Sequence, residues 1–141
     1  AISNTFEFTE KQVKDIAIPL KKLVAFDVSV TPGQIEAAVG KHGYSRYPLL
    51  DSEGDIEGYV HLKDVLDLRD DELNEPFPAK RIRSMINFAV SVELEDALAG
   101  MRRTGAQIAR AINRDGSTAG VIFLEDIIEE LVGEVQDSTS K

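Results

Sequence analysis

An internal repeat with a register of 62 residues is the feature of this sequence that most restricts its fold. Chance similarity would not keep one gap-free register over so many positions, so the repeat predicts two copies of one folding unit. Its glycines mark turns or close backbone approaches, where a Cβ atom would not fit. The aligned pairs include Phe26 and Phe88, Val28 and Val90, Ala37 and Ala99, Gly43 and Gly105, Gly54 and Gly116, Gly58 and Gly120, Leu62 and Leu124, and Asp64 and Asp126.

Each copy shows the same order of local signals: helix, strand, turn, strand, helix. In the first copy, Thr31 and Gln34 form a capping-box pattern, and Gly43 predicts the end of the helix that follows. The turn sequence 51–55 lies between two apolar runs and favours a hairpin. We expect strands at 47–50 and 56–61 and a helix from 62 in the first copy, and a helix at 94–103, strands at 108–112 and 119–123 and a helix at 124–132 in the second.

The repeat also suggests how the chain is divided. A short amphipathic helix from Thr9 to about Ile16 is expected within an N-terminal extension, residues 1–17. The first domain is expected at 18–68 and the second, with an acidic C-terminal helix, at 80–141. Residues 69–79 are charged and contain prolines, which is typical of a linker.

Composition excludes several classes of function. The formal net charge of -9 argues against a nucleic-acid partner, because phosphate-backbone binding relies on clustered Lys and Arg. The chain has no cysteine, so thiol catalysis and cysteine metal sites are excluded. It also lacks the GxSxG, P-loop and HExxH motifs, and we expect that it is not an enzyme. No apolar run is long enough to span a bilayer, so the chain is expected to be soluble.

Two sequence stretches carry a resemblance to a known family. Residues 43–51 (GYSRYPLLD) and 58–64 (GYVHLKD) resemble a CBS domain. Residues 120–134 (GVIFLEDIIEELVGE) resemble the CorC/HlyC group of haemolysin-like proteins, which are implicated in magnesium and cobalt transport. The resemblance covers residues 16–137 approximately. It implies an α+β fold of two CBS domains, each a βαββα-type unit, packed as a pseudo-twofold Bateman module.

The resemblance also implies a ligand: an adenine nucleotide, AMP or ATP, in up to two clefts. In such modules an Asp at the start of the last helix binds the ribose hydroxyls, which makes Asp64 and Asp126 the ribose candidates. A carboxylate suits this role because it accepts hydrogen bonds from two hydroxyls. The nucleotide-binding set implied for this chain is Asp64, His61, Lys63, Arg46, Tyr47, Pro48, Ile18, Leu20 and Asp126, with Arg46, Tyr47, Pro48, Ile18 and Leu20 lining the adenine side of the first cleft.

Each of these residues also has a purely structural interpretation. An Asp in the first turn of a helix is favourable without any ligand, and Tyr47 with Pro48 is equally typical of a buried strand. Where the family pattern has Ser or Thr near the phosphate, this chain has His61 in one copy and Phe123 in the other. The first cleft is therefore expected to be the better nucleotide site, unless Arg110 or Arg114 supplies the charge that Phe123 lacks.

The acidic run from Glu125 to Asp137 raises the question of a metal site. Carboxylate oxygens suit hard cations, but such a run is more typical of a solvated helix face, so no dedicated metal site is expected. Magnesium is expected to enter with the nucleotide phosphates, where it keeps most of its waters.

The resemblance implies a regulatory nucleotide-sensing module on the cytoplasmic face of a membrane, attached to a membrane domain of its parent protein. The expected partners are the nucleotide and a second copy of the chain, in a homodimer. Two alternatives stay open at this point. One is a ligand-free dimerisation scaffold, and the other is a stand-alone adenylate-sensing stress protein.

Overall fold

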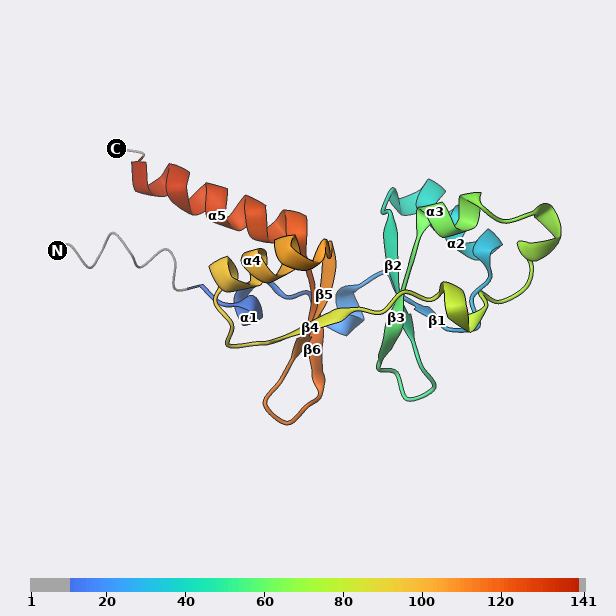
Figure 1. Ribbon diagram of the computed structural model, residues 1–141, viewed down its shortest axis with the longest axis horizontal. Helices are drawn as coiled ribbons and strands as arrows, with labels where there is room; N and C mark the ends of the chain where they lie inside the picture. The colour runs from blue at the N-terminus through green and yellow to red at the C-terminus, as the bar shows by residue number, and fades with distance from the viewer. Residues whose placement is uncertain (1–10, 140–141) are drawn as a thin grey trace. The chain divides into compact units, whose positions relative to one another are not determined.

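The computed structural model describes residues 11–139, which form two three-stranded sheets with helices packed on them (Figure 1). In each sheet the first two strands run parallel and the last two are antiparallel, in the orders β1-β2-β3 and β4-β5-β6. The strands are β1 (Phe26–Asp27), β2 (Arg46–Leu50), β3 (Ile56–His61), β4 (Ile86–Ala89), β5 (Ile108–Ile112) and β6 (Thr118–Phe123). The helices are α1 (Val13–Ile16), α2 (Pro32–His42), α3 (Leu62–Leu66), α4 (Leu94–Thr104) and α5 (Leu124–Thr139), with short 3-10 turns at Leu20–Lys22, Asp70–Glu72 and Ala79–Arg81.

The predicted repeat is confirmed in three dimensions, and so is the mixed α+β fold class. Helices α2 and α4, and the strand pairs that follow them, begin 62 residues apart. The C-caps of these two helices, Gly43 and Gly105, have φ values of 77° and 75°, a left-handed conformation that side chains with a Cβ rarely adopt. Thr31 and Gln34 form the expected capping box at the start of α2.

Strands β1 and β4 are the elements that the local patterns do not predict, and they differ in length. Strand β4 pairs with β5 over four residues, including Arg110, whereas β1 pairs with β2 only at Leu49 and Leu50. The first copy has Pro48 at the position equivalent to Arg110. Proline has no N–H to donate, so the ladder with β1 begins only after it.

Two helices have other bounds than the sequence patterns indicate. The last helix, α5, runs to Thr139, well beyond the expected end at 132. The first, α1, begins at Val13, and the expected start at Thr9 lies outside the described residues.

The chain forms two compact units. The first-copy unit is Leu23–Ser84, and the second-copy unit combines the chain up to Lys22 with the chain from Met85 onward. The sequence patterns assign residues 18–22 to the first domain, residues 69–79 to the linker and residues 80–84 to the second domain. In the structure, 18–22 joins the second-copy unit and 69–84 joins the first-copy unit.

Each unit has its own apolar core between its sheet and its helices. Burying these side chains supplies the main driving force for folding of each unit. None of the helices within residues 11–139 combines the length and the hydropathy needed to span a bilayer. The buried core residues are Val30, Ile35, Ala38, Tyr47, Leu49, Val60, Val65 and Phe77 in the first-copy unit, and Val13, Leu94, Ala97, Met101, Ala109, Ala111, Ile122 and Ile127 in the second-copy unit.

Candidate nucleotide site

In each unit, a segment from outside the repeat completes the edge of the sheet beside its last strand. The backbone of Arg83 exchanges hydrogen bonds of 3.0 and 2.8 Å with Tyr59 in β3. The backbone of Ile18 does the same with Val121 in β6, at 2.8 and 2.9 Å. Tyr59 and Val121 are equivalent in the repeat, so Arg83 and Ile18 occupy matching positions. We call residues 82–84 and 17–19 the edge segments.

The edge segments explain the glycines at the centre of the last strands. A Cβ atom on Gly58 would overlap the carbonyl oxygen of Arg83, and one on Gly120 would overlap the carbonyl oxygen of Ile18. Backbone atoms cannot move aside as the end of a flexible side chain can. Glycine is therefore required at both positions for the edge segment to reach the sheet.

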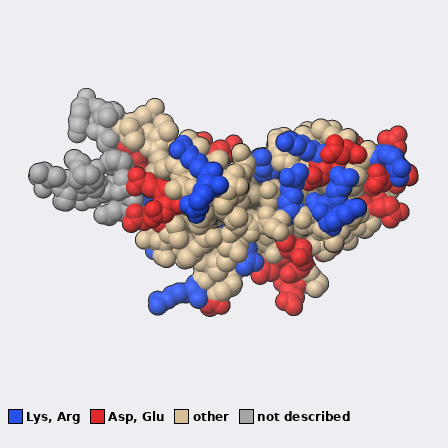
Figure 2. Space-filling model, viewed as in Figure 1, with Lys and Arg blue, Asp and Glu red and all other residues tan. Residues whose placement is uncertain are grey.

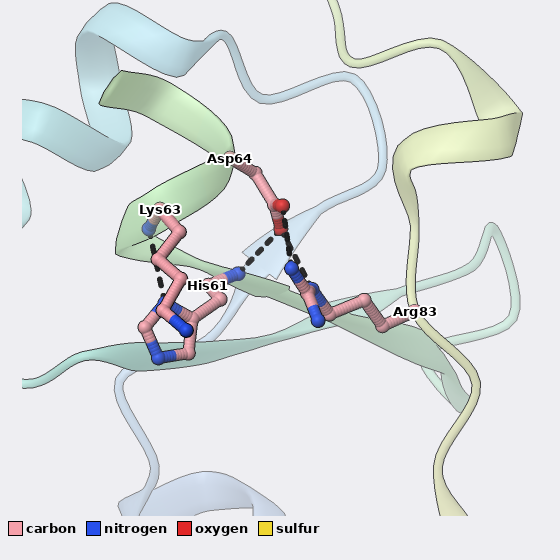
Figure 3. Close-up of polar contacts among 4 residues, drawn as sticks. All are labelled: His61, Lys63, Asp64 and Arg83. Atoms are coloured by element: carbon pink, nitrogen blue, oxygen red, sulfur yellow. Dashed lines mark hydrogen bonds and ion pairs between the residues drawn. The ribbon is translucent and has the colours of Figure 1, made fainter. Parts of the chain in front are cut away.

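In the first-copy unit, Asp64 lies in the first turn of α3 and is buried, with 6% of its surface exposed. Its carboxylate accepts two hydrogen bonds from the Arg83 guanidinium, from Nε at 3.0 Å and from Nη2 at 2.8 Å (Figure 3). It also accepts the backbone N–H of His61 at 2.9 Å. Arg83 therefore holds the carboxylate to which the family resemblance assigns the ribose.

The pKa of the Asp64 carboxyl reflects these contacts. Burial by itself would raise its pKa, but the hydrogen bonds from Arg83 and from the His61 backbone outweigh burial and lower it. The carboxylate is thus stabilised in its charged form by groups of the chain itself.

His61 is the N-cap of α3, and its Nδ1 accepts the backbone N–H of Lys63 at 2.9 Å. Its pKa is lowered by burial and then by the positive charges of Arg46, Arg83 and Lys63. A neutral imidazole whose Nδ1 accepts a hydrogen bond carries its proton on Nε2. His61 therefore offers an N–H donor at its outer nitrogen.

Four nitrogen-bearing side chains gather around this position. Arg46 faces His61 across the β2–β3 pair, the guanidinium of Arg83 holds Asp64, and the Lys63 side chain lies near enough for its charge to lower the pKa of His61. We call Arg46, His61, Lys63 and Arg83 the basic cluster. Figure 2 shows Lys and Arg side chains gathered on one face of the first-copy unit, although the chain as a whole has a net charge of -9.

The equivalent carboxyl group in the second-copy unit, that of Asp126 in α5, has different surroundings. The side chain is half-buried, and within the described residues no hydrogen-bond or ion-pair partner contacts its carboxylate. Burial raises its pKa, and the negative charges of Glu125 and Glu129 raise it further. Asp126 is therefore a carboxyl group that folding leaves without a donor.

The structure brings together four of the predicted site residues, Arg46, His61, Lys63 and Asp64. Tyr47 is fully buried in the core, where its ring packs against Phe26 with centroids 5.9 Å apart, and Pro48 beside it in β2 is also buried. Their burial favours the structural interpretation of the Tyr47-Pro48 pair.

Two residues of the predicted nucleotide-binding set belong to the second-copy unit and not to the first. Ile18 and Leu20 were expected beside the first cleft, but Ile18 pairs with β6 and Leu20 belongs to the second-copy unit with Asp126. The reason is the edge segment: the chain preceding the first copy completes the sheet of the second.

Arg83 belongs to the site but lies outside the nucleotide-binding set that the resemblance implies. It lies three residues out of the 62-residue register relative to Ile18, so sliding the sequence at a fixed shift does not align the two edge segments. The signal that could have found it is the glycine at each strand centre, which indicates that another backbone passes close by. Among residues 11–139, no group of three or more His, Cys, Asp or Glu side chains could hold a metal ion.

Comparisons with known proteins agree with this architecture. The family model described as "CBS domain" matches residues 13–71. The protein Rv1841c of Mycobacterium tuberculosis is 34% identical over 99% of this chain, and hemolysin C of Rickettsia prowazekii is 30% identical over 96% of it. The chain spans only 42% and 45% of the lengths of these two relatives.

One solved structure is similar to this chain over nearly the whole length of both proteins. It is the CBS domain of a bacterial CNNM/CorC family Mg2+ transporter in complex with ATP, with a TM-score of 0.82 and 30% identity over 94% of each chain. With two repeats of the same sheet and helix order and this degree of identity, the chain belongs to the CBS domains of the CNNM/CorC family.

Proposed function

We propose that this chain is the regulatory, non-catalytic module of a CNNM/CorC-type membrane protein, and that it binds an adenine nucleotide. One observation carries the proposal: a carboxyl group recurs in the same register in both copies, and one of the two, that of Asp126, has no partner within residues 11–139. The similar structure that contains ATP supports the choice of ligand.

Asp126 is the first choice for the ribose. A half-buried carboxylate that has lost water on folding gains from new donors, and the two hydroxyls of a ribose supply them. Ile18, which passes beside β6 in the same unit, adds apolar surface near the start of α5. Asp64 is the second choice, because a ribose would have to displace Arg83 from it.

The remaining parts of the proposal concern the whole protein. The relatives are more than twice as long as this chain, which leaves room for a membrane domain, and the module would lie on the cytoplasmic side. Magnesium would enter bound to the nucleotide phosphates. Nucleotide binding favours one conformation of the module over others, and this difference in affinity biases the attached domain.

Self-association is also proposed, through helices α3 and α5. Leu66 and Ile128 are equivalent in the repeat, and both are exposed, at 70% and 39%. Val132 follows one turn later on α5 and is 50% exposed. A second copy of the chain would cover these apolar side chains.

Isothermal titration with AMP, ADP and ATP, with and without magnesium, tests the nucleotide proposal. We expect binding by the wild type and by Asp64→Ala, and loss of binding in Asp126→Ala. Loss only in Asp64→Ala would place the nucleotide in the first cleft instead. Thermal melting without ligand confirms that each variant is folded.

The ligand-free scaffold is the second candidate function. Two observations favour the scaffold: the Asp64 carboxylate already has partners within the chain, and the Phe123 side chain has no donor for a phosphate. Absence of both heat and thermal shift at millimolar nucleotide would support the scaffold and contradict nucleotide sensing.

A further inference from the structure

The chain directly before the edge segment of the second-copy unit contacts the last helix of that unit. We call residues 11–16 the strap. The N–H of Val13 donates to the carbonyl of Val92 at 2.8 Å, and the carbonyl of Lys11 accepts the N–H of Leu94 at 3.0 Å. The Val13 side chain is fully buried in the core. Backbone hydrogen bonds and apolar burial therefore both hold the strap on its unit.

Helix α5 reaches the strap because it is longer than its counterpart in the first copy. Helix α3 ends at Leu66, whereas α5 runs to Thr139 and extends well past the strands of its sheet (Figure 1). The additional turns carry Glu130 and Glu134, and the equivalent positions of the first copy lie beyond the end of α3. Contacts between these two acids and the strap are therefore specific to the second copy.

Lys11 connects the strap to both acids. Its Nζ donates a hydrogen bond to the carboxylate of Glu130 and lies 3.7 Å from an oxygen of Glu134. The second distance allows an ion pair but is too long for a hydrogen bond. One ammonium group is therefore shared unequally between two carboxyl groups.

Glu134 is buried without a hydrogen bond to its carboxyl group. Only 7% of its surface is exposed, and within residues 11–139 neither of its carboxyl oxygens has a hydrogen-bond partner. Burial raises the pKa of Glu134, the charge of Lys11 opposes this effect, and the charges of Glu130 and Glu95 add to it. The charged groups that act on Glu134 thus come from the strap, from α5 itself and from α4.

We infer that Lys11, Glu130 and Glu134 form a proton-sensitive latch between the strap and α5, closed while Glu134 is neutral and weakened when Glu134 is ionised. The inference is independent of nucleotide binding. A neutral carboxyl group tolerates the buried position and leaves Lys11 to Glu130. An ionised one has lost its hydration and is repelled by Glu130 and Glu95, and it gains hydrogen bonds from water only when the strap and the helix separate.

The sign of the pH dependence follows from the direction of the pKa shift. A group whose pKa is raised in the closed latch stabilises that state fully below its ordinary pKa of 4.5, and this contribution is lost as the pH rises through the raised pKa. The closed latch is therefore favoured in mild acid and opens more readily as the pH rises.

Hydrogen exchange of the Val13 amide tests the latch, measured by NMR from about pH 5 to about pH 8 and corrected for intrinsic exchange rates. We expect the wild type to lose protection at Val13 as the pH rises. Glu134→Gln is neutral at every pH and should keep its protection over the whole range. The amide of Tyr59, which is bonded to Arg83 in the first-copy unit, is the internal reference and should exchange equally in both proteins.

Glu129→Gln is the matched control for loss of one negative charge from α5. Glu129 is exposed, and its charge acts on Asp126 rather than on Glu134. This variant should therefore keep the pH dependence that the wild type shows at Val13.

Two further variants should move the titration of Glu134 in opposite directions. Lys11→Met removes the opposing positive charge and should raise the pKa of Glu134 further. Glu130→Gln removes a repelling charge and frees Lys11, so it should lower that pKa. The carbon-13 chemical shift of the Glu134 carboxyl group measures both, and the pH at which Val13 loses protection should move with it.

Three outcomes would overturn the inference. The first is the same pH dependence at Val13 in the wild type and in Glu134→Gln. The second is an equal change at Tyr59, which would show a loss of overall stability rather than a local opening. The third is a Glu134 titration that neither Lys11→Met nor Glu130→Gln moves. If Glu134→Gln does not fold, these two variants decide, because both keep the carboxyl group.

Discussion

Asp64 and Asp126 occupy equivalent positions in the repeat, and their carboxyl groups nevertheless have pKa shifts of opposite sign. Burial raises the pKa of both. Only Asp64 has a guanidinium and a backbone N–H to overcome that effect. Three features separate the two copies: the edge segment carries Arg83 in one and Ile18 in the other, the His61 backbone N–H reaches only Asp64, and Glu125 and Glu129 lie near Asp126.

The Asp64–Arg83 pair should contribute to stability in a pH-dependent way. A carboxyl group whose pKa is lowered in the folded state stabilises the fold above its ordinary pKa of about 3.9, and this contribution is lost as the pH falls through the folded-state pKa. We expect Asp64→Asn to lose about 1–2 kcal/mol at pH 7, a modest figure because Arg83 is partly exposed. Urea unfolding at pH 7 and below pH 4 measures the difference, which should shrink in acid.

Asp67→Asn is the control for this measurement. Asp67 is the exposed C-cap of the same helix, and its replacement removes a negative charge without touching Arg83. An Asp64→Asn variant that loses no more stability than Asp67→Asn at neutral pH would show that the pair is not stabilising.

At the scale of the elements, the edge segments and the strand-centre glycines depend on each other. We expect Gly58→Ala and Gly120→Ala each to lose about 2 kcal/mol or more, because the added Cβ overlaps a backbone carbonyl that has no room to move. Thermal or urea unfolding monitored by circular dichroism measures the loss.

Gly40 provides the opposite control. It lies in α2 with no atom within 4 Å of its Cβ position, so Gly40→Ala should raise stability by up to about 1 kcal/mol through helix propensity. If Gly120→Ala lost no more stability than Gly40→Ala, the Ile18 backbone could not lie as close to β6 as the structure places it.

Most elements were predictable because their signals are local. The capping box of Thr31 and the left-handed C-cap at Gly43 act within one or two turns of the chain, and the repeat doubled the evidence for each element. Strand β1 was not predictable in this way, since it has two residues and forms only by pairing with β2. The pairing of Arg83 with Asp64 was not predictable for the same reason: the two residues are 19 positions apart, and no local pattern encodes their contact.

At the scale of the whole molecule, the exposed apolar residues of α3 and α5 predict self-association. We expect Leu66→Glu combined with Val132→Glu to weaken the homodimer by about tenfold or more, because charges would then have to be buried between the copies. Sedimentation equilibrium over a range of concentrations measures this.

Tyr44→Ser serves as the comparison, since Tyr44 is 55% exposed but lies outside helices α3 and α5. It should leave the association unchanged. A wild type that stays monomeric at all concentrations would contradict the proposed interface.

The edge segments also bear on the order in which the chain folds during synthesis. The first-copy unit is continuous, Leu23–Ser84, and can fold as soon as it leaves the ribosome. Residues 11–22 can dock only after β6 has been synthesised, about a hundred residues later, because Ile18 forms its backbone hydrogen bonds with Val121. Brief protease digestion of ribosome-bound chains of increasing length should therefore find the first-copy unit protected before β6 has emerged, and a unit that stays sensitive until then would rule out this order.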